Sequence, residues 1–225
     1  EISERIYQRQ VEEFGLDNMK LTEEEDVVRC PMYYDDRFAM LACNSKVISY
    51  LNQIIRGKYI LYTQNVIINR PGKEHHQSSW HRDIPYQPYI VSQPIAVSAF
   101  YCLSPFNVQT GATLLLPYSH TMEDFPSIDY VEQNAIVVEA DPGDVVLFNS
   151  WLFHRAGYNT SSIIRYGVNH VYTIPILKQQ IDLPRFLGEK YANDPLLSSL
   201  LGYEFSTPSS VLEFRERRLK KKTSR

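Results

Sequence analysis

The sequence predicts a mainly β fold, a sandwich or jelly roll, with helices packed against it. Six short segments in the middle of the chain are rich in β-branched and aromatic residues, with Pro or Gly between them: 59–69, 93–103, 112–116, 135–139, 145–149 and 165–174. Short strands separated in this way favour a sandwich or jelly roll over alternating βαβ units. With 225 residues, 44% of them hydrophobic, the chain can bury one sizeable core, so we expect one domain over residues 1–225.

Within that domain we expect a helical lead-in over about residues 1–58, a barrel over about 59–175 and a C-terminal extension over about 176–225. Asn44 is a good N-cap for one helix of the lead-in, and Gly57 can end it. Apolar residues recur on one face of this helix, at Val47, Ile48, Leu51, Ile54 and Ile55. This helix should therefore pack against the sheet.

A final helix is predicted to open at Thr207-Pro208, with Pro in its first turn. Its end is basic, with Arg215, Arg217, Arg218, Lys220, Lys221 and Lys222. We interpret this basic end as a solvated helix end with favourable dipole placement rather than a ligand site.

Composition excludes some classes of function. The formal net charge of −3 argues against a general nucleic-acid binder, which needs a basic face, and no apolar run approaches the ~20 residues of a membrane span. The three cysteines, Cys30, Cys43 and Cys102, are widely spaced and form no Cys-x-x-Cys pair, so we expect inert thiols in a reducing, cytoplasmic compartment. The chain begins at Glu1 rather than Met, so a targeting segment upstream stays open. Nothing in the sequence indicates an oligomeric state.

A candidate metal site lies at His81 and Asp83. The two residues are two positions apart, so on a strand both side chains leave the same face and can reach one ion. We expect His154 to supply a third ligand. Two imidazoles and one carboxylate on one side of an octahedron leave the other positions open, as expected of non-haem Fe(II) oxygenases.

Arg165 is a candidate anchor for a cosubstrate. It follows His154 by eleven positions, across the turn-forming segment 157–162, so we expect the two residues on adjacent antiparallel strands. An Arg held there can bind a carboxylate in a bidentate fashion while the other end of the same molecule chelates the metal. 2-Oxoglutarate is such a molecule.

The chain resembles the phytanoyl-CoA dioxygenase family of Fe(II)/2-oxoglutarate oxygenases. The resemblance rests on residues 80–86, 111–120 and 141–148 and on the His154 to Arg165 spacing, which together span most of the chain from about residue 60 to 175. It implies a double-stranded β-helix with Fe(II) at its open mouth, 2-oxoglutarate and O2 as cosubstrates, and hydroxylation of a small organic molecule with formation of succinate and CO2.

Two positions qualify the resemblance. Tyr118 stands where the family more often has Gly before a Ser-His pair; it lies outside the proposed ligands and bears on loop shape. Related halogenases have a small residue in place of the carboxylate ligand. The presence of Asp83 therefore favours hydroxylation, with ring closure or desaturation as other outcomes of the same chemistry.

Further cosubstrate contacts are expected from two strands. Ser98 and Phe100 alternate on one face of a strand that, by the resemblance, lines the cosubstrate pocket, so either can touch 2-oxoglutarate. Gln64 and Asn65 are polar interruptions of an apolar strand; one of them can bind a cosubstrate carboxylate, and a structural hydrogen bond is an equal alternative. Arg82 is expected to face the cosubstrate or the substrate.

Five aromatic residues could wall the pocket: Tyr86, Tyr89, Phe100, Trp151 and Phe153. The remaining histidines are expected to be structural rather than ligands: His75, His76, His120 and His170. The substrate is expected to be a small organic molecule, with Arg82 or Arg155 available to pair an acidic group.

Two alternatives stay open. One is a cupin-type metal enzyme that uses the same ligands without 2-oxoglutarate, against which Arg165 argues because that chemistry needs no carboxylate anchor there. The other is a non-catalytic β-barrel that serves as a binding module, which the presence of all four proposed residues disfavours.

Overall fold

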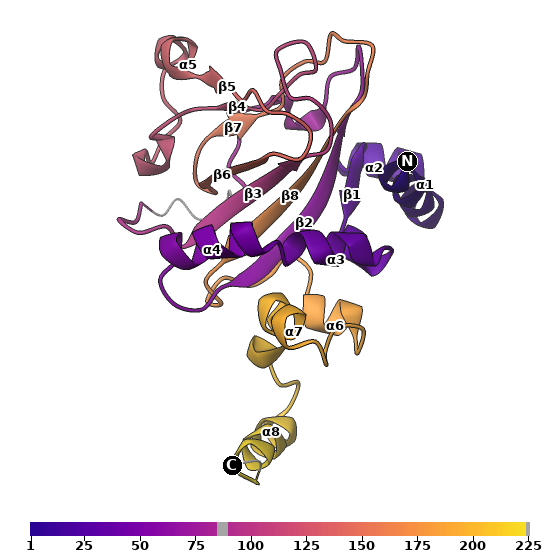
Figure 1. The fold of residues 1–225 in the computed structure, drawn as a ribbon, viewed down its shortest axis with the longest axis vertical. Helices are drawn as coiled ribbons and strands as arrows, with labels where there is room; N and C mark the ends of the chain where they lie inside the picture. The colour runs from indigo at the N-terminus through magenta and orange to yellow at the C-terminus, as the bar shows by residue number, and fades with distance from the viewer. Residues whose placement is uncertain (85–89, 224–225) are drawn as a thin grey trace.

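Two antiparallel sheets form the body of the protein in the computed structural model, which describes residues 1–84 and 90–223 (Figure 1). The five strands of the larger sheet lie in the order β1 (Val27–Arg29), β2 (Ile60–Asn69), β8 (Arg165–Thr173), β3 (Ala96–Cys102) and β6 (Val145–Asn149). The smaller sheet has the order β5 (Ile136–Val137), β4 (Leu114–Leu115) and β7 (His154–Arg155). All of these strand pairs are antiparallel.

Helices make up more of the chain than strands do. The α-helices are α1 (Ile2–Phe14), α2 (Leu16–Leu21), α3 (Asp36–Ala42), α4 (Ser45–Ile54), α5 (Ile128–Asn134), α6 (Leu183–Leu187), α7 (Pro195–Leu201) and α8 (Val211–Thr223). Single 3-10 turns are η1 (Pro31–Tyr33), η2 (His76–Ser78), η3 (Ser119–Thr121) and η4 (Tyr203–Phe205). About 37% of the residues are helical and 20% are in strands. The prediction of a mainly β fold was therefore wrong, because both flanking regions are helical and the strands of the smaller sheet are only two residues long.

The helix predicted from Asn44 is α4. The Asn44 side chain accepts two hydrogen bonds from backbone N–H groups of the first turn, which confirms it as the N-cap. Val47 and Leu51 are buried against the sheet. The helix ends at Ile54, before Gly57, which lies in the following turn with a φ of 98°.

The larger sheet is covered on both faces. Helices α3 and α4 run across its outer face, where Phe38 and Leu51 pack with Tyr172 of β8 (Figure 1). Its inner face contributes Phe100 to a second core that also contains Leu115 of the smaller sheet. The space between the two sheets is therefore partly filled by side chains, and the remainder holds the candidate site.

His154 and Arg165 lie on strands of different sheets, so the expectation that their strands are adjacent was wrong. β7 pairs with β4, whereas β8 pairs with β2 and β3. The segment 156–164 crosses from one sheet to the other instead of forming a hairpin. The Asn159 amide fixes this crossing, because it donates hydrogen bonds of 2.9 Å to the carbonyls of both Asn69 and Ile163.

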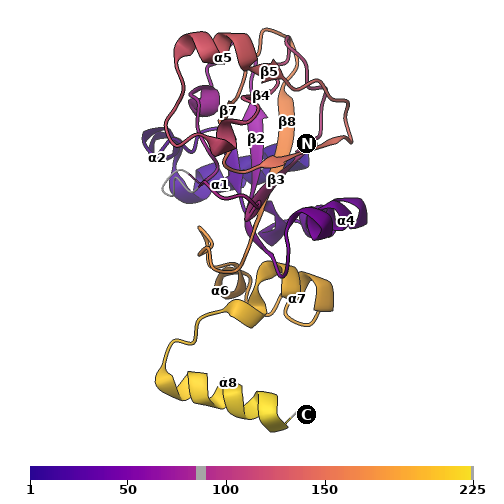
Figure 2. The ribbon, with the colours of Figure 1, turned by 90° about the vertical axis from the view of Figure 1, so that its left-hand side faces the viewer.

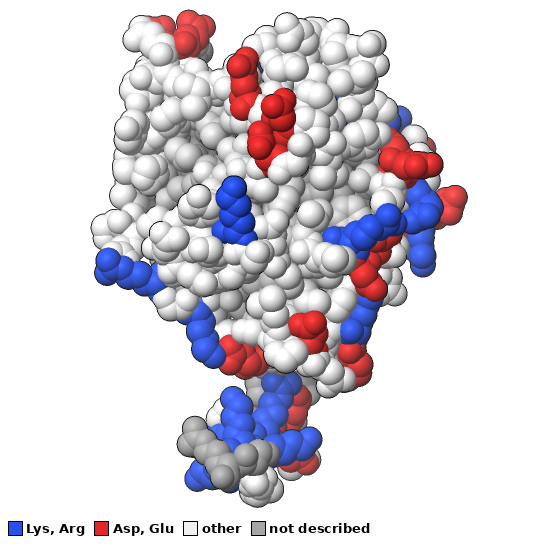
Figure 3. All heavy atoms as spheres, in the orientation of Figure 1, with Lys and Arg blue, Asp and Glu red and all other residues white. Residues whose placement is uncertain are grey.

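The C-terminal helix α8 extends away from the body of the molecule (Figures 1 and 2). It begins at Val211, so Pro208 lies before the helix and not in its first turn as predicted. The N–H of Glu213 donates a hydrogen bond of 3.1 Å to the Ser210 hydroxyl, so Ser210 caps the start of the helix. Basic side chains gather over α8 (Figure 3). Among the helices of residues 1–84 and 90–223, none is long and apolar enough to cross a membrane.

Candidate active site

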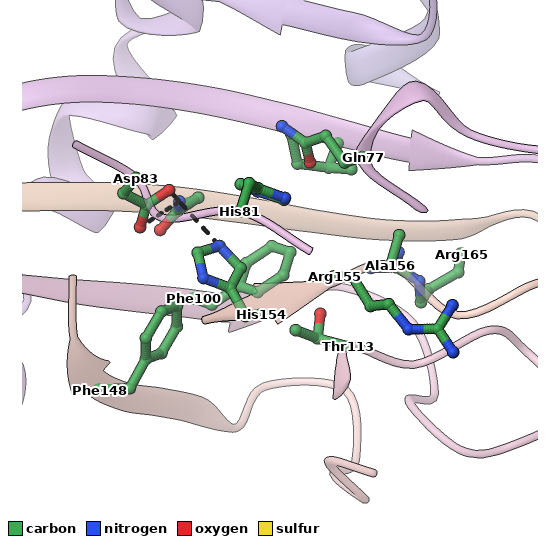
Figure 4. A pocket seen from close by; sticks show the side chains of 12 residues that line it. Gln77, His81, Asp83, Phe100, Thr113, Phe148, His154, Arg155, Ala156 and Arg165 are labelled. Carbon is green, nitrogen blue, oxygen red and sulfur yellow. Dashed lines mark hydrogen bonds and ion pairs between the residues drawn. The ribbon is translucent and has the colours of Figure 1, made fainter. Parts of the chain in front are cut away.

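Two neighbouring backbone segments bring His81, Asp83 and His154 together. The N–H of His81 donates to the carbonyl of His154 at 2.9 Å, and the N–H of His154 donates back at 3.0 Å. Two residues further along, the N–H of Asp83 donates to the carbonyl of Ser150 at 3.2 Å. The three side chains point toward one another, with one potential ligand atom of each within 4.8 Å of the others (Figure 4). They can therefore hold one metal ion.

Backbone carbonyls orient both imidazoles. The Nδ1 atom of His81 lies 2.9 Å from the carbonyl oxygen of Ser79, and Nδ1 of His154 lies 3.0 Å from that of Leu152. Because a carbonyl oxygen only accepts hydrogen bonds, each neutral ring carries its proton on Nδ1 and leaves the Nε2 lone pair available. Hydrogen bonds of this kind fix the tautomer of metal-binding histidines.

The Asp83 carboxylate is held by two donors. The Ser98 hydroxyl donates to Oδ2, and the Asn169 amide donates to Oδ1 at 3.2 Å. Ser98 is itself 2.8 Å from the hydroxyl of Ser150. These bonds fix the carboxylate beside His154, whose Nε2 lies 3.7 Å from Oδ1. Ser98 thus lies in the site as expected, but it contacts Asp83 and is not a free cosubstrate donor.

Protonation states at the site suit a cation. Burial alone would raise the pKa of Asp83. The neighbouring His154 and the hydrogen bond from Ser98 outweigh this effect and lower the pKa to about 2. Burial, together with the proximity of His154, lowers the pKa of His81 to about 4. Burial also lowers the pKa of His154, but the Asp83 charge outweighs this and raises it overall. At neutral pH the site therefore has an anionic carboxylate and a neutral His81, the forms that bind metal.

Arg165 is completely buried on β8 and lies on the same face of the strand as Asn169. Its Nε and Nη1 atoms have no hydrogen-bond partner among the described residues. The guanidinium carbon is 4.6 Å from the centre of the Phe106 ring. Burial lowers the pKa of Arg165 to about 10, so the side chain is still cationic at neutral pH. A buried cation with unused donors is unfavourable by itself and fits an anionic ligand.

One cavity connects Arg165 with the three metal-binding candidates (Figure 4). Its other lining residues include Phe100, as expected, and four side chains that sequence reasoning missed: Gln77, Thr113, Phe148 and Asn169. The cavity places a buried cation with unused donors at one end and a group that could hold a metal ion at the other. A dicarboxylic 2-oxo acid matches this donor set.

Three of the missed residues carried a signal in the sequence. Asn169 is four positions after Arg165, so the two side chains leave the same face of a strand. Thr113 belongs to the 111–120 segment that the family resemblance had singled out. Phe148 belongs to the 141–148 segment on which the resemblance also rests. For Gln77 we find no such signal.

Gln64 and Asn65 point in opposite directions. The Gln64 amide donates to the carbonyl of Phe38 at 2.9 Å, and its oxygen accepts the N–H of Met32 at 3.1 Å, so it lies in the outer core and not at the site. Asn65 lies on the site side of β2, beside a neighbouring cleft. In the amide orientation that satisfies the neighbouring donors and acceptors, the Asn65 side-chain oxygen accepts a hydrogen bond of 2.9 Å from Nη1 of Arg29.

Arg82 does not line the cavity that contains Arg165. It lies between His81 and Asp83 in the chain, and its side chain therefore leaves the opposite face of the extended segment. The guanidinium donates to four backbone carbonyls, those of Trp151 (2.9 Å), Ser119 (3.2 Å), Glu123 (3.3 Å) and Met122. It also lies 4.0 Å from the centre of the Phe153 ring. Arg82 therefore ties the 119–123 loop to the segment that holds the metal-binding candidates.

The remaining predicted aromatic residues and histidines lie outside this cavity or outside the described part of the chain. Tyr86 and Tyr89 lie outside the described residues. Trp151 and Phe153 do not line the cavity. Among the described residues, His81, Asp83 and His154 are the one group of three side chains placed to bind a metal, so His75, His76, His120 and His170 are not part of such a group.

The fold and the site together define a non-haem iron oxygenase that uses 2-oxoglutarate and O2. The sequence profile of the phytanoyl-CoA dioxygenase family matches residues 4–167, and the chain belongs to this family. It is 33% identical over 194 residues to the uncharacterized protein Rv1501 of Mycobacterium tuberculosis, covering 82% of this chain and 69% of that protein. It is 31% identical over 131 residues to the dioxygenase olcK of Penicillium canescens, covering 55% and 42%.

Solved structures of similar fold come from related enzymes. The α-ketoglutarate-dependent epimerase SnoN from nogalamycin biosynthesis has a TM-score of 0.56 at 18% identity, over 66% of this chain and 60% of that one. EctD from S. alaskensis with bound Fe has a TM-score of 0.55 at 18% identity, over 67% and 57%. HygX from Streptomyces hygroscopicus, with nickel, 2-oxoglutarate and hygromycin B bound, has a TM-score of 0.56 at 15% identity, over 71% and 74%.

Proposed function

We propose that this oxygenase hydroxylates a small organic molecule, that His81, Asp83 and His154 hold Fe(II), and that Arg165 binds the distal carboxylate of 2-oxoglutarate. The observation that carries the proposal is the buried cation of Arg165 in the same cavity as the three metal-binding side chains. This pairing also disfavours the cupin-type alternative, because a metal enzyme without 2-oxoglutarate needs no buried cation at that position.

The overall reaction balances without a further reductant. One oxygen atom of O2 enters the substrate, where a C–H bond becomes a C–OH group, and the other enters succinate as 2-oxoglutarate loses CO2. Bound Fe(II) would supply the activation of O2 that side chains cannot provide.

The chain's own residues would orient and protect the reactants. Arg165 would fix one end of the cosubstrate through charge-assisted hydrogen bonds. Asn169 and Ser98 would hold the Asp83 carboxylate in place, while the rings of Phe100 and Phe148 would keep water from the inner part of the cavity.

The same proposal includes the finer architecture. Two facing antiparallel sheets with an apolar core between them support a double-stranded β-helix, open at the end where His81 and His154 lie. The outer core contains side chains from Ile6 to Leu201, which supports a single domain built from lead-in, barrel and extension.

The proposal can be tested by mass-spectrometric measurement of succinate formed from 2-oxoglutarate, Fe(II) and O2. We expect slow succinate formation by the wild-type protein without any added substrate, and none by Asp83→Ala. Glu213→Gln on α8 is the control and should behave as wild type. Wild-type succinate formation no faster than that of Asp83→Ala would overturn the proposal.

A further inference from the structure

A second cavity, an open cleft, reaches two of the metal-binding candidates. It shares Ile67, Gln77, His81, Asp83 and Asn169 with the first cavity. Arg165 and Thr113 line only the first cavity. If the first cavity holds 2-oxoglutarate, the second is the space from which a substrate can approach the metal.

The walls of this cleft are polar. Ile67 is its one apolar side chain among the described residues, and every other described lining residue can form hydrogen bonds. Most small-molecule pockets are instead lined mainly by apolar and aromatic side chains. An acyl chain or a terpene placed here would remove water from these groups without replacing its hydrogen bonds, which is unfavourable.

An ion pair lies in the wall of the cleft. Arg29 of β1 donates to both carboxylate oxygens of Glu24, from Nε at 2.6 Å and from Nη2 at 2.5 Å. Its third nitrogen, Nη1, contacts the Asn65 oxygen. The side chains of Arg29 and Glu24 have exposed fractions of 33% and 29%. The position of the pair is thus fixed, and part of it faces the cleft.

The cleft has no uncommitted cation for an anionic group. The charge of Arg29 is balanced by Glu24, and the Arg82 guanidinium is bound to backbone carbonyls on the other face of its segment. Among the described residues these two are the only Lys or Arg that line the cleft. The arrangement therefore does not support the expectation that Arg82 forms an ion pair with an acidic group of the substrate.

We propose, resting on the oxygenase function above, that this cleft binds the substrate and that the substrate is a polyhydroxylated, uncharged or cationic molecule of the sugar, cyclitol or aminosugar class, recognised by the Glu24–Arg29 pair. A hydroxyl group both donates and accepts hydrogen bonds. The pair offers both functions side by side, since the carboxylate retains acceptor lone pairs and the guanidinium retains N–H groups beyond those used in the pair. An amino group would be favoured by the carboxylate. A site of this kind discriminates strongly against analogues that lack the hydroxyl groups.

The test measures binding of small probes by saturation-transfer NMR to the full chain loaded with 2-oxoglutarate and with Zn²⁺ in place of Fe²⁺, so that no turnover occurs. The hydrophilic probes are methyl α-D-glucopyranoside, myo-inositol and glucosamine; octanoate and phenylacetate are the apolar acids. We expect stronger signals from the hydrophilic probes. The variant Glu24→Ala/Arg29→Ala should weaken their binding at least about fivefold, as expected for loss of a hydrogen-bonding pair worth roughly 1 kcal/mol.

The matched control is Glu213→Ala/Arg217→Ala, which removes a Glu–Arg pair of the same kind on α8 and should change nothing. If the double variant at the cleft does not fold, Glu24→Ala alone serves, and the same loss of binding is expected. Preference for octanoate or phenylacetate, or hydrophilic binding that survives both cleft variants, would overturn the inference. Binding of 2-oxoglutarate is measured in the same samples: if it binds and the probes do not, this inference fails alone, whereas a protein that binds no 2-oxoglutarate refutes the proposed function.

Discussion

The backbones of His81 and His154 form a reciprocal pair of hydrogen bonds, of 2.9 Å and 3.0 Å. Their ring centres are 4.3 Å apart. The relative position of two proposed iron ligands, far apart in the sequence, is thus set by strand pairing and not by the ion. We expect the site to be preformed, so that metal binding contributes less to folding than it does at a closed structural site.

Replacing Arg165 should have opposite effects on binding and on stability. In Arg165→Met the affinity for 2-oxoglutarate should fall by roughly 2–5 kcal/mol, because a desolvated charged contact is lost, while metal affinity is unchanged. Without 2-oxoglutarate the variant should be at least as stable as the wild type, since a buried cation with unused donors is replaced by an apolar chain of similar length. Calorimetric titration and chemical denaturation check the two parts. A clear loss of stability with unchanged affinity would assign Arg165 a structural role.

Metal binding should release a proton from His154 at pH 6.5 and below. The pKa of His81 is lowered to about 4 by burial and by His154, so this ring is already neutral. His154 has a pKa above the usual 6.5 because of Asp83, so it is protonated at and below that pH in the metal-free protein. Metal affinity should therefore rise with pH through the pKa of His154 and then level off. Calorimetry of Zn²⁺ binding in buffers of different ionisation enthalpy counts the protons. Release of two protons at pH 6.5 would show that His81 is also charged.

Ser98→Ala should weaken metal binding without removing a ligand. The hydroxyl of Ser98 donates to Asp83, and loss of such a supporting contact typically lowers metal affinity about 10–100-fold. Competition titration with a chelating dye measures this affinity. Ser161→Ala, in the loop between β7 and β8, is a suitable control. Wild-type affinity in Ser98→Ala would show that Asp83 is held adequately by Asn169 alone.

Arg82→Ala should destabilise the fold and spare 2-oxoglutarate binding. It removes the donor to four carbonyls of two segments, and hydrogen bonds to charged groups contribute about 1.5–3 kcal/mol each when measured singly, so a loss of roughly 3 kcal/mol is expected. Urea denaturation measures the loss, and Arg155→Ala, with one long hydrogen bond of 3.5 Å, is the milder comparison. Weaker 2-oxoglutarate binding at unchanged stability would show instead that Arg82 contacts the cosubstrate.

Four of the five strands of the larger sheet could be predicted from their β-branched and aromatic residues. β6 has the predicted bounds, β2 and β8 differ from prediction by one residue at one end, and β3 was predicted too long, over 93–103. The short strand β1 was not predicted. The smaller sheet was predicted too long. Its strand β5 is half-exposed at Ile136, so little burial supports extended pairing beyond two residues.

The candidates His81 and Asp83 followed from their spacing within one extended segment, whereas other assignments needed the three-dimensional arrangement. Alternation along a strand places Gln64 and Asn65 on opposite faces, and it also separates Arg82 from His81 and Asp83. That rule could have excluded Arg82 from the site. Spacing along the chain could not show that His154 and Arg165 belong to different sheets, because a loop of the same length can form a hairpin or a crossing.

The central claim is that His81, Asp83 and His154 hold Fe(II) beside a 2-oxoglutarate molecule anchored by Arg165. Its most direct test is anaerobic titration of the Fe(II)-loaded protein with 2-oxoglutarate, following the weak visible charge-transfer band of the chelate, with His81→Ala as the control. We predict a saturable band in the wild-type protein, its absence in His81→Ala, and a shift to much higher 2-oxoglutarate concentration in Arg165→Met. Iron binding without any band would contradict the account and favour a metal enzyme that does not use 2-oxoglutarate.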